Sequence, residues 1–274
     1  MKKHFIPILT LFISCQSLAY QVNEVNIPSK LMGISKNAMV VTPDSYDGTK
    51  KFPVVYLLHG YSGSYADWTK NTDVEHFSDL YNIILVMPDG DFDKWYVDSP
   101  INDHYKYQSY VGEEVVNYID QNYKTIEKKA GRAITGLSMG GFGAFNLAMN
   151  YRNTFGNVGS ISGAVDPQKY LGNDWGVETV LGKPVPANKT WEERSIIANA
   201  NKFLHQDINI TFECGVDDFF SQDNRDLHNR LLKLRINHDY SERPGEHNWE
   251  YWNNAIQYQL KFFSDKFVKY KKYL

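Results

Sequence analysis

Residues 134–150 read ITGLSMGGFGAFNLAMN and contain four glycines around a single serine. Gly136, Ser138 and Gly140 match the pattern G-x-S-x-G, but glycine and serine are common enough that chance matches occur. The stretch is open to three interpretations: a simple turn, a cradle for phosphate, or a sharp turn that presents a nucleophile. The segments on either side of the stretch distinguish among these three interpretations.

The neighbouring residues favour the nucleophile turn. A short buried strand is predicted over 131–136 and an apolar helix over 142–150, which is the strand–turn–helix setting of a nucleophile elbow. Small residues around Ser138 allow the strand and the helix to pack closely, and Gly141 and Gly143 extend this packing. The phosphate interpretation lacks its motifs, because the sequence contains neither G-x-x-x-x-G-K-[ST] nor an early G-x-G-x-x-G followed by an acidic residue.

The rest of the chain alternates short apolar runs with helical patterns, which predicts an α/β fold with a mostly parallel central sheet flanked by helices. Strands are expected over 52–60, 82–90, 131–136, 156–163, 208–215 and 238–245, and helices over 111–123, 142–150, 223–234 and 249–263. The region around 166–205 is rich in glycine and proline, and we interpret it as an insertion over the sheet edge. Parallel sheets bind ligands at the carboxyl ends of their strands. Chemistry is therefore expected near His59, Asp89, Gly136 and Gly215.

A serine nucleophile needs a base, and behind a nucleophile elbow the chain order is serine, acid, histidine. His247 lies between the last predicted strand and the last predicted helix, where this base belongs. The simpler alternative is a surface or helix-capping histidine. The other histidines after Ser138 lie before or within predicted strands and helices: His205, His228 and His238.

The acid is expected in CGVDDFF, which follows the strand over 208–215. Asp218 is favoured because it lies three residues past Gly215 and next to Phe219, an apolar lining for a partly buried carboxylate. Asp217 is the alternative, with the character of an exposed loop charge.

Ester cleavage also requires donors for the oxyanion that forms on the carbonyl oxygen. The backbone N–H of Met139, directly after the serine, is one candidate. The other is the N–H of Tyr61 in LLHGYSGSYADW, where glycines permit a bent backbone after the strand over 52–60.

Five blocks of the sequence together resemble one known family. YLLHGYSGSYADW, VMPDG…WYVDSP, GLSMGGFGAFNLA, CGVDDFF and GEHNWEYW look like the successive blocks of the putative esterase family within the α/β-hydrolases, and they span residues 54–252. That family includes S-formylglutathione hydrolase (esterase D), tributyrin esterases, feruloyl and acetyl-xylan esterase modules, and mycobacterial mycolyltransferases. The resemblance implies an α/β-hydrolase fold. It also implies Ser138 as nucleophile, Asp218 as acid and His247 as base, with the N–H groups of Tyr61 and Met139 as oxyanion donors.

The same resemblance implies substrate-binding residues. Trp95 and Tyr96 match a segment that borders the acyl pocket, although aromatic core packing is an equally open interpretation. His59 is a further candidate at the end of its strand. The resemblance implies no metal and no organic cofactor.

The first 19 residues indicate export. Two lysines precede a short apolar run and a small-residue site at Ala19, the pattern of a signal peptide, and the apolar run is shorter than the ~20 residues that a membrane span needs. A single catalytic domain is expected over 21–274. FISC around Cys15 loosely resembles a lipoprotein box, so a lipid anchor there is the alternative to cleavage near Ala19. Cleavage near Ala19 would remove Cys15, and lipidation would block its thiol. In both cases Cys214 is the only thiol left, which excludes an intramolecular disulfide.

These observations predict an exported, periplasmic or secreted, serine esterase that removes feruloyl or acetyl groups from plant polysaccharide. A formal charge of -3 with scattered basic residues gives no reason to expect nucleic-acid binding. Three alternatives stay open: an S-formylglutathione hydrolase-like thioesterase, an acyltransferase, and a non-catalytic carbohydrate-binding relative. The export signal argues against the first and the intact Ser/Asp/His set against the last.

Overall fold

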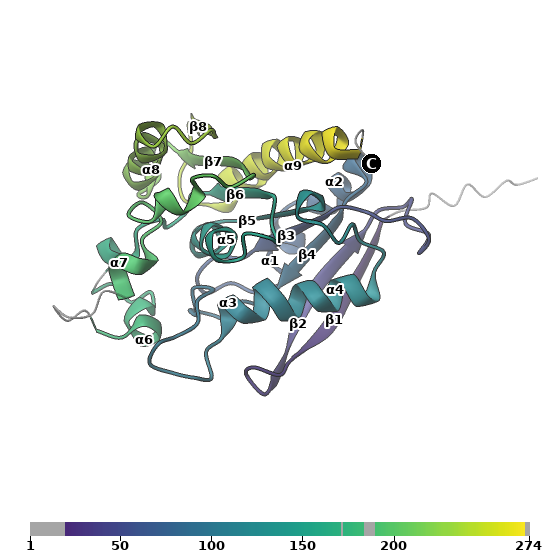
Figure 1. Cartoon of the computed structure of the whole chain (residues 1–274), viewed down its shortest axis with the longest axis horizontal. Coiled ribbons are helices and arrows are strands. Elements are labelled where there is room, and N and C mark those ends of the chain that lie inside the picture. Colours follow the sequence, from purple (N-terminus) through teal and green to yellow (C-terminus); the bar gives the residue numbers. More distant parts are fainter. Residues whose placement is uncertain (1–19, 171, 184–189, 272–274) are drawn as a thin grey trace, which may run out of the picture.

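The computed structural model describes residues 20–170, 172–183 and 190–271, which form a sheet flanked by helices (Figure 1). The described residues contain an eight-stranded sheet in the order β1-β2-β4-β3-β5-β6-β7-β8. β1 pairs antiparallel with β2 and β2 antiparallel with β4, whereas all other neighbours are parallel. This confirms the predicted, mostly parallel α/β sheet. The strands are β1 (Gln21–Ser29), β2 (Ile34–Thr42), β3 (Val54–Leu58), β4 (Ile84–Pro88), β5 (Arg132–Gly136), β6 (Asn157–Ile161), β7 (Asn209–Gly215) and β8 (Asp239–Arg243).

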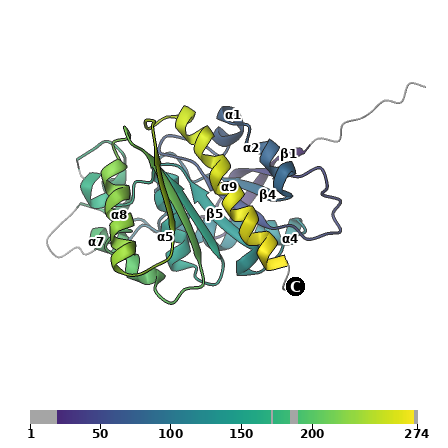
Figure 2. The ribbon, with the colours of Figure 1, turned by 90° about the horizontal axis from the view of Figure 1, so that it is seen from above.

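Alternate residues of the central strands supply two hydrophobic layers, one on each face of the sheet. In β3, Val54, Tyr56 and Leu58 belong to one cluster, and Val55 and Leu57 to the other. Helices α3 (Tyr107–Ser109), α4 (Val116–Asn122), α5 (Met139–Asn150) and α8 (Ser221–Lys233) cover the first face. Helices α1 (Asp67–Asn71), α2 (Val74–Tyr81) and α9 (Trp249–Lys271) cover the second, and Figure 2 shows α9 lying across the sheet. A π-helical turn, Tyr110–Val115, joins α3 to α4.

All six predicted strands are present, with bounds within a few residues of those expected. The β1–β2 hairpin was not predicted. The first half of β1 is exposed and polar, so it lacks the apolar run that marks a buried strand. None of the helices within the described ranges is both long and apolar enough to cross a membrane. The predicted signal peptide and Cys15 lie outside the described residues.

The segment expected to be an insertion over the sheet edge lies elsewhere. It contains the 3-10 turns Pro167–Tyr170 and Ala200–Phe203 and the short helices α6 (Val177–Leu181) and α7 (Thr190–Arg194). Trp95 donates its indole N–H to the Trp175 carbonyl at 2.8 Å, and Tyr61 donates its hydroxyl to the Asp174 carbonyl at 2.7 Å. Because Tyr61 and Trp95 follow the central strands β3 and β4, the insertion lies over the carboxyl ends of the sheet. It therefore forms part of the surroundings of the site.

Candidate active site

Ser138 occupies a strained turn between β5 and α5. Its backbone angles are φ 55° and ψ -118°, a conformation that non-glycine residues rarely adopt. The helix begins at the next residue, Met139, and only Leu137 lies between the end of β5 and the serine. Ser138 N–H donates to the Ile161 carbonyl at 3.0 Å, and the Ser138 carbonyl accepts from Phe142 N–H at 3.1 Å. Backbone hydrogen bonds on both sides thus hold the elbow.

The glycines on either side of Ser138 are required by close backbone contacts. A Cβ at Gly140 would lie 2.4 Å from the Leu58 carbonyl oxygen, and one at Gly136 would lie 2.6 Å from the same atom. A Cβ at Gly143 would lie 2.5 Å from the ring of Tyr96. The glycine-rich motif therefore brings α5 directly against the end of β3, the strand that leads into the Tyr61 loop.

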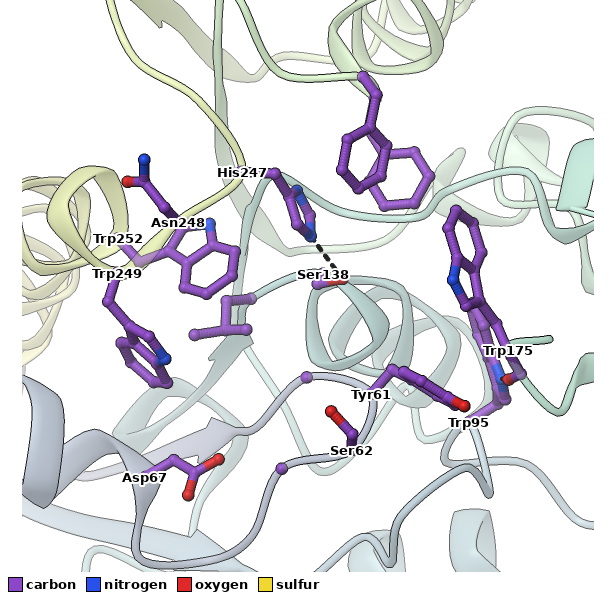
Figure 3. Close-up of a pocket in the computed structure, with 15 residues that line it drawn as sticks. Tyr61, Ser62, Asp67, Trp95, Ser138, Trp175, His247, Asn248, Trp249 and Trp252 are labelled. Atoms are coloured by element: carbon purple, nitrogen blue, oxygen red, sulfur yellow. Dashed lines mark hydrogen bonds between the residues drawn. The ribbon is translucent and has the colours of Figure 1, made fainter. Parts of the chain in front are cut away.

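The structure brings Ser138, His247 and Asp218 into one hydrogen-bonded chain. His247 Nε2 lies 3.0 Å from Ser138 Oγ (Figure 3), and His247 Nδ1 lies 2.8 Å from Asp218 Oδ2. A carboxylate can only accept, so Nδ1–H donates to Asp218 and the bare Nε2 faces the serine hydroxyl. This is the arrangement in which a histidine can accept the serine proton.

The two competing aspartates lie in different environments. Asp218 is 2% exposed, and its second oxygen accepts the Phe220 N–H at 2.8 Å. Asp217 is exposed, and its backbone N–H donates a hydrogen bond to the Gly245 carbonyl at 3.1 Å. Phe219, expected to line the carboxylate, is 62% exposed and packs on the His247 ring with a centroid distance of 4.3 Å. Of the two aspartates, Asp218 is therefore the one that is hydrogen-bonded to His247.

Two backbone N–H groups border the serine without acceptors among the described residues. Met139 is the first residue of α5, so its N–H has no partner in the preceding turn of helix. In the loop after β3, Ser62 N–H donates to the Phe92 carbonyl and Gly63 N–H to the Gly60 carbonyl. Tyr61 N–H is left free between them. These are the two N–H groups that the sequence predicted as oxyanion donors.

His59 does not line the pocket. Its side chain is 1% exposed, with Nδ1–H donating to the Gly60 carbonyl at 2.8 Å and Nε2 accepting Gly90 N–H at 2.9 Å. These bonds fix a neutral tautomer and join the loops after β3 and β4. Tyr96 is fully buried and donates its hydroxyl to the His59 carbonyl at 3.1 Å. The side chains of His59 and Tyr96 are thus buried beneath the loops after β3 and β4 and stabilise them. They do not line the pocket, which differs from the prediction that they bind the substrate.

Ser138 and His247 open onto a cavity of about 470 Å³ with largely aromatic walls. Trp95 lines it, as expected, while its indole packs on Phe142 at 5.7 Å. Figure 3 shows Trp95 and Trp175 on one side of Ser138 and Trp249 and Trp252 on the other. The remaining lining residues are Gly60, Tyr61, Ser62, Gly63, Asp67, Leu137, Phe219, Phe220 and Asn248.

Several lining residues were not predicted as such. Asp67, Trp249 and Trp252 stand in the same sequence blocks as Tyr61 and His247, so proximity along the chain was an available signal. Trp175 comes from the insertion, where no motif marks it.

The thiol of Cys214 is not placed to act as an alternative nucleophile. It is fully buried, and burial raises the pKa of its thiol far above its usual range, so the reactive thiolate does not form. Within the described ranges, no group of three or more His, Cys, Asp or Glu side chains is placed to hold a metal ion.

Comparison with known proteins shows the family and the fold of this chain. The family model described as "Putative esterase" matches residues 29–263. An acetyl esterase of Caldicellulosiruptor saccharolyticus is 26% identical over 264 residues, covering 89% of this chain and 98% of the relative. Among solved structures, the fluorophosphonate-binding serine hydrolase FphF of Staphylococcus aureus superposes with a TM-score of 0.81 at 23% identity, covering 90% and 99% of the two chains. A ferulic acid esterase superposes with a TM-score of 0.77 at 24% identity, covering 91% and 99%. The chain has the α/β-hydrolase fold of these structures and belongs to the esterase family of that fold.

Proposed function

We propose that this protein is a serine carboxylic ester hydrolase that uses Ser138, His247 and Asp218 as its catalytic triad. The observation that carries the proposal is the hydrogen-bonded chain from the Asp218 carboxylate through His247 to Ser138 Oγ, at 2.8 and 3.0 Å. Membership of the esterase family supports the reaction class independently.

The proposed reaction has two steps. Nε2 of His247 takes the hydroxyl proton as Ser138 Oγ attacks the ester carbonyl, and Asp218 stabilises the imidazolium that forms. The N–H groups of Tyr61 and Met139 bind the oxyanion, and His247 then gives its proton to the departing alcohol. The same base activates a water that hydrolyses the acyl-enzyme and regenerates the serine.

For the substrate we propose acetyl or feruloyl esters of plant polysaccharide, cleaved outside the cytoplasm. The acetyl esterase relative supports the acetyl group, and the aromatic walls of the pocket suit stacking on a phenolic acyl group or a sugar ring. The charged and apolar pattern of residues 1–19 supports export. The same triad would also serve an acyltransferase, in which a sugar hydroxyl replaces water. Product analysis with and without a sugar acceptor separates the two reactions.

The test of the reaction class is hydrolysis of p-nitrophenyl acetate by Ser138→Ala. Loss of the nucleophile is expected to lower kcat by at least about 10³-fold with an unchanged circular-dichroism spectrum. Ser62→Ala is the matched control, because Ser62 is a second serine that lines the same pocket, and we expect activity close to that of the wild type. Near-normal hydrolysis by Ser138→Ala would overturn the proposal.

The substrate class is tested by assaying methyl ferulate, acetylated xylan and S-formylglutathione in parallel. We expect the highest kcat/KM on one of the first two. A preference for S-formylglutathione would contradict the polysaccharide assignment and leave the reaction class unchanged.

A further inference from the structure

Asp67 is the one acidic side chain that lines the catalytic cavity in the described part of the chain, and no lysine or arginine lines it. Figure 3 shows Asp67 on the same side of the pocket as Trp249 and across from Trp175. The mechanism proposed above does not use this carboxylate. Its negative charge stands among aromatic and small polar groups, and no described lysine, arginine or histidine forms a salt bridge with it.

The Asp67 carboxylate is held in place by its own loop. One oxygen accepts the Ser64 N–H and the other the Ser64 hydroxyl, each at 2.9 Å. A Cβ at Gly63 would lie 2.5 Å from Asp67 Oδ2, so the carboxylate packs directly on the backbone of the loop that carries Tyr61. A carboxylate has about four acceptor positions, and two are used here. Each oxygen can still accept a hydrogen bond.

We propose, on the basis of the ester hydrolase function above, that Asp67 selects the substrate by charge. Its fixed carboxylate accepts hydrogen bonds from the hydroxyl groups of neutral, polyol-type substrates and repels substrates that carry a negative charge. At a separation of about 6 Å and an effective dielectric constant of about 40, between that of bulk water and that of a protein surface, such repulsion corresponds to roughly a tenfold loss of kcat/KM. Sugar esters are neutral and rich in hydroxyl groups, whereas glutathione thioesters are anionic. Asp67 thus favours the first class over the second.

The experiment compares Asp67→Asn with the wild type on two matched pairs of esters. The first pair carries its charge on the acyl side: p-nitrophenyl hydrogen succinate and its neutral methyl ester. The second carries it on the alcohol side: p-acetoxybenzoate and its methyl ester. Asparagine has nearly the same shape as aspartate and retains an acceptor for the Ser64 N–H, so the variant removes the charge with little change to the loop.

We expect Asp67→Asn to raise the ratio of anionic to neutral kcat/KM about 5–10-fold in at least one pair, with the neutral esters changed by less than about twofold. Raising the salt concentration from about 20 to about 500 mM should raise this ratio in the wild type and leave it nearly unchanged in the variant. A purely structural role would not produce that salt dependence. Glu250→Gln, which removes an exposed carboxylate that does not line the cavity, is the matched control and should leave both ratios unchanged.

Equal changes for anionic and neutral esters in both pairs would overturn the charge-selection role of Asp67. Failure of the wild-type protein to cleave the neutral esters would instead overturn the proposed hydrolase function, on which the role rests.

Discussion

Asp217 and Asp218 are adjacent in the chain, yet only one is buried against the histidine. Asp218→Asn would place an N–H donor opposite His247 Nδ1, which disfavours the tautomer whose Nε2 accepts the serine proton. We expect kcat for p-nitrophenyl acetate to fall about 10³–10⁴-fold in Asp218→Asn and to change by less than about twofold in Asp217→Asn. A larger loss in Asp217→Asn would show that the acid has been assigned to the wrong residue.

Gly140 illustrates why the motif around the serine requires glycine. Its missing Cβ would lie 2.4 Å from the Leu58 carbonyl and 2.6 Å from the His59 carbonyl, and the backbone at both sites has little room to shift. Gly140→Ala should therefore lower the free energy of unfolding in urea by about 2–3 kcal/mol. Gly60→Ala is the comparison, because its Cβ would meet first the flexible end of Leu137, at 2.7 Å, and should cost less. Equal losses would contradict the steric explanation.

At the scale of the elements, two histidines join α8 to the residue directly before β8: His228 lies in α8, and His238 precedes the strand. His238 Nδ1–H donates to the Ile236 carbonyl at 2.7 Å, so its Nε2 accepts from His228 Nδ1–H at 2.8 Å. Burial, together with the charge of His238, lowers the pKa of His228. The pKa of the folded state is thus below that of the unfolded chain, near 6.5, and the unfolded state binds more protons between the two values.

Stability from this pair is complete above the unfolded pKa and is lost as the pH falls through the folded pKa. We expect the free energy of unfolding to decrease between about pH 7.5 and pH 5, and to decrease less in His228→Gln. Urea titrations of both proteins at each pH make the comparison, because the other acidic and basic groups are common to both. An equal decrease in the free energy of unfolding with falling pH in the wild type and in His228→Gln would contradict a role for the lowered pKa of His228.

The strands buried on both faces could be predicted from sequence, as could the partly exposed β8, whereas the solvated β1–β2 hairpin could not. β3, β4, β5 and β6 are buried along their whole length and read as short apolar runs between turn residues. The β1–β2 hairpin lies at the edge of the sheet and is partly solvated, so its residues give no such run. The position of the insertion depends on contacts with the Tyr61 and Trp95 loops, which no local pattern encodes.

At the scale of the whole molecule, the sheet topology assembles the site. Ser138 and His247 are 109 residues apart in the chain and 3.0 Å apart in space, because β5 and β8 lie in one sheet and present their carboxyl ends on the same side. The G-x-S-x-G motif, strand-end position and chain order therefore selected Ser138 and His247 and narrowed the acid to Asp217 or Asp218. The pocket walls could not be selected in this way, since Trp175, Trp249 and Asp67 converge through the packing of three separate segments. His59 also stands at a strand end, and Tyr96 lies in the loop after β4, but the side chains of both are buried beneath the pocket.

We propose Ser138 as a nucleophile that His247 activates. The most direct measurement is labelling of the intact protein with a fluorophosphonate probe, followed by peptide mapping by mass spectrometry. We predict a single adduct on Ser138, and labelling slowed by at least about 10²-fold in His247→Ala, because the hydroxyl then lacks its base. Labelling of a different residue, or no labelling of a folded wild-type protein, would contradict the account.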